Sequence, residues 1–426
     1  MTQLPVAFTE KTRQLMGDER FERYLKSFEE DAPVSIRLNP KKLAVGNWQL
    51  AVSHEQVPWC QNGYYLKQRP NFTFDPLFHA GCYYVQEAAS MFLDEVLRQT
   101  SPIPSQGGEK SSSPLGRLGE VLDMCAAPGG KSTLLRAALP EDCVLYSNEP
   151  VRNRASILLE NVSKWGYDNH YVTNAYPKDY RASKLRFDVI LCDVPCSGEG
   201  MFRKDEATIR EWSPQQVEKC RQLQRDIVSD AWVCLNDGGL LIYSTCTFNI
   251  KENEENIRWI LETFDDAKVV SIETKPEWNI TGSLLNGFDE PVYRFIPGIS
   301  RGEGLFMCVL RKGEEDVFRT EEKNFHSEKK IILTEKQKLL TEKTMALQAE
   351  GPQVELTYQQ AMAYLRHEAL VLPEDTPHGL VNVSFMGHRL GPVKNIGTRA
   401  NNLYPKEWKI KTTHIPTEYE PILKQI

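Results

Sequence analysis

The sequence has little of what marks a secreted or membrane protein. Its first residues, MTQLPVAFTEK, have no cationic start followed by an apolar run, so no signal peptide is expected. No stretch of about 18 apolar residues occurs, and none of the ten cysteines forms a Cys-x-x-Cys pair. We therefore expect a cytoplasmic protein without a membrane partner, whose cysteines are reduced thiols available for chemistry.

An overall excess of positive charge is also absent, because the formal net charge is -7. The chain therefore lacks the basic coat of many nucleic-acid-binding proteins, although a local basic patch remains possible. Residues 387–411 contain six basic residues and one acidic residue, with Tyr404 and Trp408 between them. Such a strip is typical of RNA binding through phosphates and stacked bases. A basic surface over two core aromatics is an equal alternative.

The 426 residues are enough for about three domains. Thr100–Gly116 is rich in Pro, Ser and Gly and is predicted to be a flexible loop. Val85–Arg98 has the pattern of an amphipathic helix. The predicted division is an N-terminal domain (1–75), a central domain (76–312), a charged linker (313–353) and a C-terminal domain (354–426).

From Glu120 onward, strand patterns alternate with helix patterns. The apolar runs EVLDMC, CVLYSNE, HYVTNA, FDVILCDVP and GGLLIYSTCT are predicted strands, each followed by a turn or an amphipathic segment. In the longest predicted helix, Ser213 can cap the start, Pro214 suits the first turn and Gln216 can complete a capping box. The alternation predicts an α/β fold with a mostly parallel, doubly wound sheet.

The segment MCAAPGGKST, residues 124–133, holds most of a phosphate-binding P-loop. The first glycine of that motif would lie at position 125, where the chain has Cys125. FDVILCD could still end in a magnesium-binding aspartate, so an ATPase remains open on this fragment. The alternative is a nucleoside ligand at a strand end, with Glu149, 20 residues after Gly129, accepting from the ribose hydroxyls.

Two cysteines follow predicted strand ends, Cys196 in DVPCSGEG and Cys246 in YSTCT. Ligand sites of open α/β sheets lie at these ends, so both thiols and Asp193 should converge on the 125–131 loop. A thiolate that adds to carbon 6 of cytosine lets carbon 5 accept a methyl group. Because a free thiol is only roughly 3% ionised at pH 7, the site must assist. A Cys192–Cys196 metal pair lacks further ligands at a recognisable spacing, so no metal is expected.

Four segments together resemble the Fmu/Sun-type RNA cytosine-C5 methyltransferases, which use S-adenosylmethionine. They are the segments GCYYVQEAASM (81–91), CAAPGGK (125–131), DVPCSGEGMFRKD (193–205) and YSTCT (243–247). The C-terminal stretch GPVKNIGTRANNLYP (391–405) is similar to the tail of the RsmF-type branch, which modifies 16S ribosomal RNA.

The resemblance implies a Rossmann-like class I methyltransferase domain between an N-terminal α+β RNA-recognition domain and a C-terminal PUA-like RNA-binding domain. It implies that Cys246 is the nucleophile and that Cys196 assists proton removal and product release. Arg203 and Lys204 would hold the RNA backbone, with a solvated surface pair as a nearly equal alternative. The implied cofactor-binding residues are Cys125, Ala126, Ala127, Pro128, Gly129, Gly130, Lys131, Glu149, Arg154, Asn174 and Asp193.

The chain departs from the family pattern at one place. Many relatives carry an aspartate after the third strand, near the adenine, whereas this region reads TNAYPKDY. Asn174 and Tyr176 occupy the corresponding places, and Asp179 comes later. The resemblance implies RNA as the partner, within 16S rRNA or the small ribosomal subunit. The alternatives are a P-loop ATPase, a non-catalytic RNA-binding protein and a DNA methyltransferase, which would place its nucleophile in the proline–cysteine motif.

Overall fold

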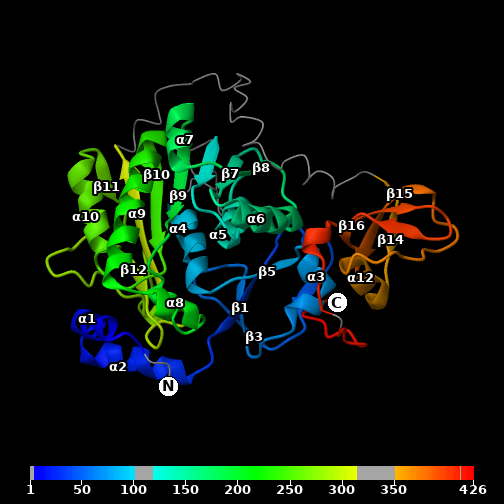
Figure 1. Ribbon diagram of the computed structural model, residues 1–426, viewed down its shortest axis with the longest axis horizontal. Coiled ribbons are helices and arrows are strands. Elements are labelled where there is room, and N and C mark those ends of the chain that lie inside the picture. The colour runs from blue at the N-terminus through cyan, green and yellow to red at the C-terminus, as the bar shows by residue number, and fades with distance from the viewer. Residues whose placement is uncertain (1–3, 101–118, 314–350, 413) are drawn as a thin grey trace.

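The computed structural model describes residues 4–100, 119–313, 351–412 and 414–426. A large sheet with flanking helices forms one end of the molecule, and the C-terminal domain lies at the other end (Figure 1). The predicted loop Thr100–Gly116, apart from Thr100, and most of the predicted linker 313–353 lie outside the described residues. The three predicted boundaries between the domains and the linker therefore remain predictions.

The central sheet has the strand order β11-β13-β10-β9-β6-β7-β8, and β12 pairs with β13. The five strands from β10 to β8 are parallel, whereas β13 runs antiparallel to β10. This confirms the predicted mostly parallel α/β fold. The strands are β6 (Glu120–Asp123), β7 (Val144–Asn148), β8 (His170–Thr173), β9 (Phe187–Asp193), β10 (Leu235–Thr245), β11 (Ala267–Val269), β12 (Tyr293–Phe295) and β13 (Leu305–Lys312).

Helices cover both faces of this sheet because successive strand residues point to opposite sides. Val121 packs in the hydrophobic cluster of α4 and α5, whereas the next residue, Leu122, packs in the cluster of α9 and α10. The helices of this region are α4 (Phe92–Thr100), α5 (Gly130–Ala138), α6 (Arg152–Trp165), α7 (Pro177–Ser183), α8 (Glu206–Glu211), α9 (Pro214–Cys234) and α10 (Glu254–Thr263).

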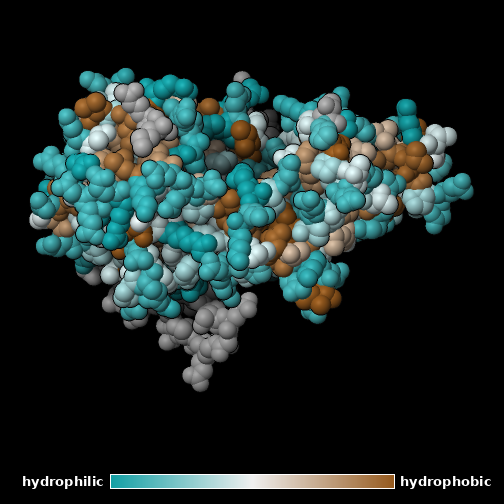
Figure 2. Space-filling view, turned by 90° about the horizontal axis from the view of Figure 1, so that it is seen from below, coloured by the Kyte–Doolittle hydropathy of each residue, from teal (hydrophilic) through white to brown (hydrophobic). Residues whose placement is uncertain are grey.

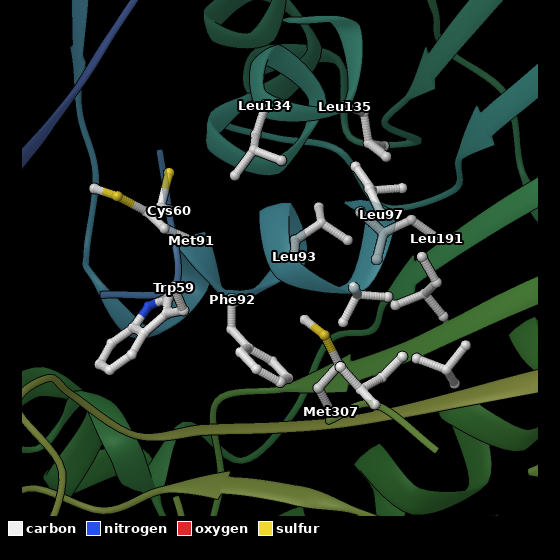
Figure 3. Packing of buried hydrophobic residues seen from close by; sticks show 14 of the residues in the cluster. Trp59, Cys60, Met91, Phe92, Leu93, Leu97, Leu134, Leu135, Leu191 and Met307 are labelled. Atoms are coloured by element: carbon white, nitrogen blue, oxygen red, sulfur yellow. The ribbon is translucent and has the colours of Figure 1, made fainter. Parts of the chain in front are cut away.

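Helix α4 fills the space between α5 and the sheet. Leu93 and Leu97 of α4 point between Leu134 of α5 on one side and Met307 of β13 on the other (Figure 3). All four side chains are almost fully buried. Burying each such side chain stabilises the fold by about 1.5–3 kcal/mol, so α4 is an integral part of this core.

The predicted helix Val85–Arg98 begins later than expected. Tyr83–Val85 forms strand β5, which pairs with β1 (Val34–Leu38), and a short 3-10 turn (Ala89–Met91) precedes α4. The Gln86 amide donates to the carbonyl of Ser35 in β1, so the backbone pairing with β1 continues to Gln86. The α9 prediction fared better, because Ser213 Oγ accepts from the Gln216 amide at 3.1 Å.

The N-terminal part consists of two helices and a small sheet of order β3-β4-β1-β5. Because β5 belongs to this sheet, hydrogen-bonded pairing extends past residue 75 to Val85. The elements are α1 (Val6–Met16), α2 (Asp18–Lys26), β2 (Trp48–Leu50), β3 (His54–Gln56), β4 (Gly63–Leu66) and α3 (Pro76–His79).

The C-terminal domain pairs its strands in the order β14-β15-β16-β17, with one helix against them. The last strand, β18 (Leu423–Gln425), returns to pair with β2, and one hydrophobic cluster joins Ile36 and Tyr83 to Val381. The N- and C-terminal parts thus share a core. The elements are β14 (Gln353–Glu355), α12 (Tyr358–Leu365), β15 (Gly379–Phe385), β16 (His388–Asn395) and β17 (Ala400–Asn402).

The aromatic residues of the basic strip 387–411 take part in this core. Tyr404 is only 2% exposed and packs against Tyr364 with ring centroids 5.3 Å apart. Trp408 is half-buried beside Tyr404. Tyr404 therefore cannot stack on an RNA base, and for this residue the core alternative is the right one.

The surface seen from below is mostly hydrophilic, with hydrophobic residues gathered in small separate groups (Figure 2). Among the described residues, none of the helices combines the length and the apolar character that a membrane span requires.

Candidate active site

The loop between β6 and α5 lies at the carboxyl end of the first strand of the parallel sheet. Gly129 has a φ of 114°, a left-handed conformation that glycine adopts without strain, and α5 begins directly after it. The Ala126 amide donates to the Asn148 carbonyl at 2.8 Å, which ties the loop to the end of β7. The loop contains seven of the predicted site residues, Cys125, Ala126, Ala127, Pro128, Gly129, Gly130 and Lys131.

Three further predicted residues form one group beside this loop. The Glu149 side chain is almost fully buried, and Arg154, which is half exposed, lies 3.2 Å from its Oε2. Arg154 also donates to the Ala127 carbonyl at 3.0 Å. Asn174 donates to the carbonyls of Glu149 and Pro150 at 2.6 and 2.9 Å. Asn174 thus braces the turn that presents Glu149, while Arg154 connects that turn to the loop.

Lys131 and Asp193 connect the loop to the neighbouring strand ends. Lys131 Nζ donates to Asp193 Oδ2 at 2.8 Å, and Ser244 Oγ donates to Asp193 Oδ1 at 2.8 Å. Burial by itself lowers the pKa of Lys131, but the Asp193 carboxylate outweighs burial and raises that pKa above its ordinary value. The ammonium group therefore stays charged at neutral pH.

A second carboxyl group lies under the loop. Asp123, the last residue of β6, is fully buried and accepts from Ser132 Oγ at 2.5 Å. Burial raises the pKa of Asp123 to about 7, and the nearby Asp193 acts in the same direction. Three carboxyl groups, those of Asp123, Glu149 and Asp193, thus lie at the strand ends around the loop.

The two predicted catalytic cysteines meet at this edge of the sheet. Cys196, after β9, and Cys246, after β10, are free thiols with their sulfur atoms 3.2 Å apart. The Cys246 amide also points at Cys196 Sγ, at 3.4 Å. The adjacent Cys246 thiol, together with burial, raises the pKa of Cys196 well above its ordinary value. Cys196 therefore keeps its proton at neutral pH and can donate it toward Cys246.

The loops that carry the two cysteines are fastened to each other. The Gly200 amide donates to the Cys246 carbonyl at 2.8 Å, and the Ser197 and Thr247 hydroxyls lie 2.9 Å apart. A Cβ atom on Gly200 would come within 2.6 Å of the Cys246 carbonyl oxygen, so the approach requires glycine. The sulfur positions are therefore set by the backbone rather than by mobile side chains.

Two buried glutamates, which the sequence analysis did not identify, hold these loops in place. Glu199 accepts from the Phe248 and Asn249 amides, both at 2.8 Å. Glu252 accepts from the Ser197 amide at 3.0 Å, and burial raises its pKa to about 7. The only sequence signals were a glutamate between two glycines and a polar run, KENEEN.

The expectation that Arg203 holds the RNA backbone is wrong. Its side chain is 6% exposed, lies 3.2 Å from the Glu303 carboxylate and donates to the Glu30 carbonyl at 3.1 Å. It therefore joins the N-terminal part to the site region. Lys204 is exposed, and its role remains a prediction.

Beyond the third strand, Asp179 accepts from the Tyr176 amide at 2.9 Å at the start of α7. The Tyr176 side chain is 59% exposed. In the part of the chain that the structure describes, no group of three or more His, Cys, Asp or Glu side chains is arranged to hold a metal ion.

Three protein-family models match successive parts of the chain. They describe the N-terminal domain of 16S rRNA methyltransferase RsmF (residues 4–88), 16S rRNA methyltransferase RsmB/F (117–311) and the methyltransferase RsmF PUA domain (352–410). The match to the third model confirms the predicted PUA-like domain.

Curated relatives bear the name ribosomal RNA small subunit methyltransferase F. The proteins of Erwinia tasmaniensis and Pectobacterium atrosepticum are each 32% identical to this chain, over 321 and 326 residues. Each match covers 72% of this chain and 63% of the relative, so the chain spans less than two thirds of the length of these proteins.

Solved structures share the fold. A methyltransferase homolog protein from Pyrococcus horikoshii is 27% identical, with a TM-score of 0.54, over 72% of this chain and 100% of the other. NSun6 from the same organism, solved with SFG, is 19% identical, with a TM-score of 0.56, over 73% and 98% of the two chains. The three matches follow the same order as the parts of the described fold, so the chain is RsmF-like in its N-terminal, methyltransferase and PUA regions.

Proposed function

We propose that this protein transfers a methyl group from S-adenosylmethionine to carbon 5 of cytosine in RNA, most specifically in 16S rRNA of the small ribosomal subunit. The observation that carries the proposal is the pair of thiols, Cys196 and Cys246, 3.2 Å apart beside the 125–131 loop. The names of the matched family models and relatives support the same activity. Such a substrate implies that the protein works in the cytoplasm.

The residues of the crevice fit the proposed cofactor. S-adenosylmethionine, when bound, supplies an electrophilic methyl group on a positively charged sulfur. Glu149 offers a buried carboxylate for the ribose hydroxyls, and its present contact with the half-exposed Arg154 can be given up. The amino end of α5 at Gly130 suits the carboxylate of the cofactor. Asp193, which is paired with Lys131, and Asp123, whose pKa is about 7, add two carboxyl groups near the proposed place of the cationic sulfur.

The cysteines provide the chemistry on the base. We propose that Cys246 Sγ bonds to carbon 6 of a flipped-out cytosine, which makes carbon 5 able to take the methyl group. Loss of the carbon 5 proton then lets the bond between Sγ and carbon 6 break. Cys196 takes part in this second stage: its thiol proton passes to the departing Cys246 sulfur, 3.2 Å away, and the Cys196 thiolate so formed takes the carbon 5 proton. The raised pKa of Cys196 makes this thiolate a stronger base.

The RNA would be held by parts on both sides of the crevice. The N-terminal and PUA matches flank the methyltransferase match, and the basic strip 387–411 lies within the PUA region. The negative net charge does not oppose RNA binding, since binding needs only a local cationic face.

The test is methyl transfer from labelled S-adenosylmethionine to unmodified small subunits and to naked 16S rRNA, followed by mapping of the labelled base. Label on cytosine carbon 5 in either substrate would support cofactor, reaction and substrate class together. Absence of label from both would overturn the ribosomal substrate, and transfer RNA and large-subunit RNA would be tested next. Label on another atom would overturn the role of the thiol pair.

A further inference from the structure

A cationic cavity of about 330 Å³ lies where the three matched regions meet, at the far end of α6 from the cofactor loop. Its walls come from the segment after β1 (Lys41, Lys42), the end of α6 (Lys164) and strand β16 (Arg389). Figure 1 shows the end of α6 directed toward α3 and the C-terminal domain. Since each region contributes only part of the wall, the cavity requires the assembled protein.

Positive charge predominates in this cavity. Lys41, Lys42, Lys164 and Arg389 line it, and Asp168 is the one carboxylate among its lining residues. Lys41 Nζ pairs with Asp168 at 2.9 Å, and Lys164 Nζ pairs with Glu160, on the preceding turn, at 2.5 Å. These carboxylates therefore compensate two of the three lysines, Lys41 and Lys164.

Lys42 is the least compensated cation of the group. No carboxylate of the described residues lies within ion-pair distance of its ammonium group. Burial lowers the pKa of Lys42, and the neighbouring Arg389 and Lys41 lower it further. The carbonyls at the end of α6 offset part of this cost, because the negative end of a helix dipole stabilises a cation by roughly 0.3–1 kcal/mol. This stabilisation is smaller than the cost of burying the Lys42 ammonium group beside Arg389 and Lys41.

The cavity wall is rigid before any ligand arrives. Asn39 Nδ2 donates to the carbonyls of Gly81 and Trp165 at 2.8 and 2.9 Å, and its Oδ1 accepts from the Lys41 amide at 3.1 Å. A Cβ atom on Gly81 would overlap the Lys164 carbonyl, so this close approach depends on glycine. Lys42 is thus anchored through its own segment, and little ordering entropy would be lost on binding an anion.

We propose that this cavity binds a backbone phosphate of the RNA substrate, at a distance from the reacting base. A phosphate oxygen on Lys42 would provide the missing negative charge, and Arg389 can add a second contact from the PUA region. Arg154 and Lys164 are about 15 Å apart along α6, given a rise of 1.5 Å per residue. A strand that reaches from the crevice to the cavity would span several nucleotides. This inference rests on the proposed function only in taking RNA as the ligand.

The experiment compares the variant Lys42→Gln with wild type and with Lys67→Gln, which removes an exposed lysine from the same N-terminal part. The binding of naked 16S rRNA is measured at several salt concentrations. We expect Lys42→Gln to bind roughly tenfold more weakly and to show a salt slope smaller by about 0.7–0.9, the value for one phosphate contact. Lys67→Gln and Lys42→Arg should keep the wild-type slope.

Two further readouts separate folding and chemistry from this contact. The affinity of Lys42→Gln for S-adenosylmethionine should equal that of wild type, and its melting temperature should be at least as high, because the uncompensated charge is removed. An unchanged salt slope, or an equal loss in Lys67→Gln, would overturn the inference. The binding of inorganic pyrophosphate to Lys42→Gln is measured as well. If this variant loses pyrophosphate binding but keeps the wild-type salt slope for RNA, the cavity binds a free anion and the inference is overturned.

The outcome for the proposed function is read independently. If the salt slope of RNA binding depends on Lys42 but wild type transfers no methyl group to RNA, the proposed function is overturned and the phosphate-binding inference is supported. If wild type methylates RNA and Lys42→Gln keeps the wild-type salt slope of RNA binding, only the phosphate-binding inference is overturned.

Discussion

The two ends of helix α6 face opposite charges. At its start, Arg154 contacts Glu149, and the neighbouring strand ends carry Asp123 and Asp193, of which Asp193 is paired with Lys131. At its end, Lys164 faces a cavity whose lining includes four cationic side chains and one carboxylate. Arg154 and Lys164 are about 15 Å apart along the helix, given a rise of 1.5 Å per residue, so the two groups of charges do not contact each other. An acidic protein can thereby offer an anionic site to a cationic cofactor and a cationic site to RNA.

The largest effect is expected for the variant Cys246→Ala, which removes the proposed nucleophile from the site near the start of α6. Without a sulfur atom to bond carbon 6, methyl transfer should fall by more than about 1000-fold, as for other removed nucleophiles. The rate of label transfer from S-adenosylmethionine measures this, while the salt slope of RNA binding should not change. Cys234→Ala, at a buried cysteine of α9, is the control for loss of a thiol. Turnover at the wild-type rate by Cys246→Ala would exclude this nucleophile.

Glu149→Gln should weaken the anionic end and leave the cationic end intact. Loss of a hydrogen bond to a charged group costs about 1.5–3 kcal/mol, so S-adenosylmethionine should bind about 10- to 100-fold more weakly. Titration calorimetry with the cofactor gives this value directly. The salt slope of RNA binding, which reports on the cavity at the other end of α6, should be the same for Glu149→Gln and wild type. An unchanged cofactor affinity would remove Glu149 from the site.

Asp75→Asn tests how the walls of the cationic end are held together. Asp75 accepts from Tyr83 of β5 at 2.7 Å and from Tyr419 near the C-terminus at 3.0 Å. Burial raises the pKa of Asp75 to about 6. The folded state therefore keeps this proton to a higher pH than the unfolded state, whose pKa is about 4. The contribution of Asp75 to the free energy of unfolding must fall as pH rises from about 4 to 6.

Urea unfolding at pH 5 and pH 7 measures this contribution. We expect wild type to lose on the order of 1 kcal/mol of stability between these pH values through Asp75, and Asp75→Asn to lack that part of the loss. Identical pH dependences of the two proteins would show that Asp75 does not titrate in this range.

The smallest predicted effect is a gain at the cationic end. Glu160→Gln frees Lys164 from its partner on α6 and raises the net charge of the cavity region by one. RNA binding should strengthen about two- to threefold, which matches the modest energy of an i,i+4 ion pair. Affinity measured at low salt will show the gain best. Weaker RNA binding by Glu160→Gln would mean that the pair with Lys164 has a structural role in the wall.

Much of the methyltransferase region could be predicted from the sequence. Each predicted strand from Glu120 to Thr245 is present, because apolar runs bounded by turns specify strands locally. The convergence of Cys196, Cys246 and Asp193 on the 125–131 loop followed from one topological rule, that parallel strands end at the same edge. The prediction that a helix begins at Val85 is wrong, because Val85 pairs with β1, a strand distant in the sequence.

By itself the sequence determined the alternation of strands and helices, the glycine turn at Gly129 and the presence of two thiols after strand ends. Tertiary structure alone decided that Arg203 pairs with Glu303, that Tyr404 is buried and that Lys42, Lys164 and Arg389 line one cavity. Local patterns depend on neighbours in the chain, whereas these contacts join residues that are distant in the sequence. Such partners are chosen by the packing of the whole molecule, in which the last strand returns to β2.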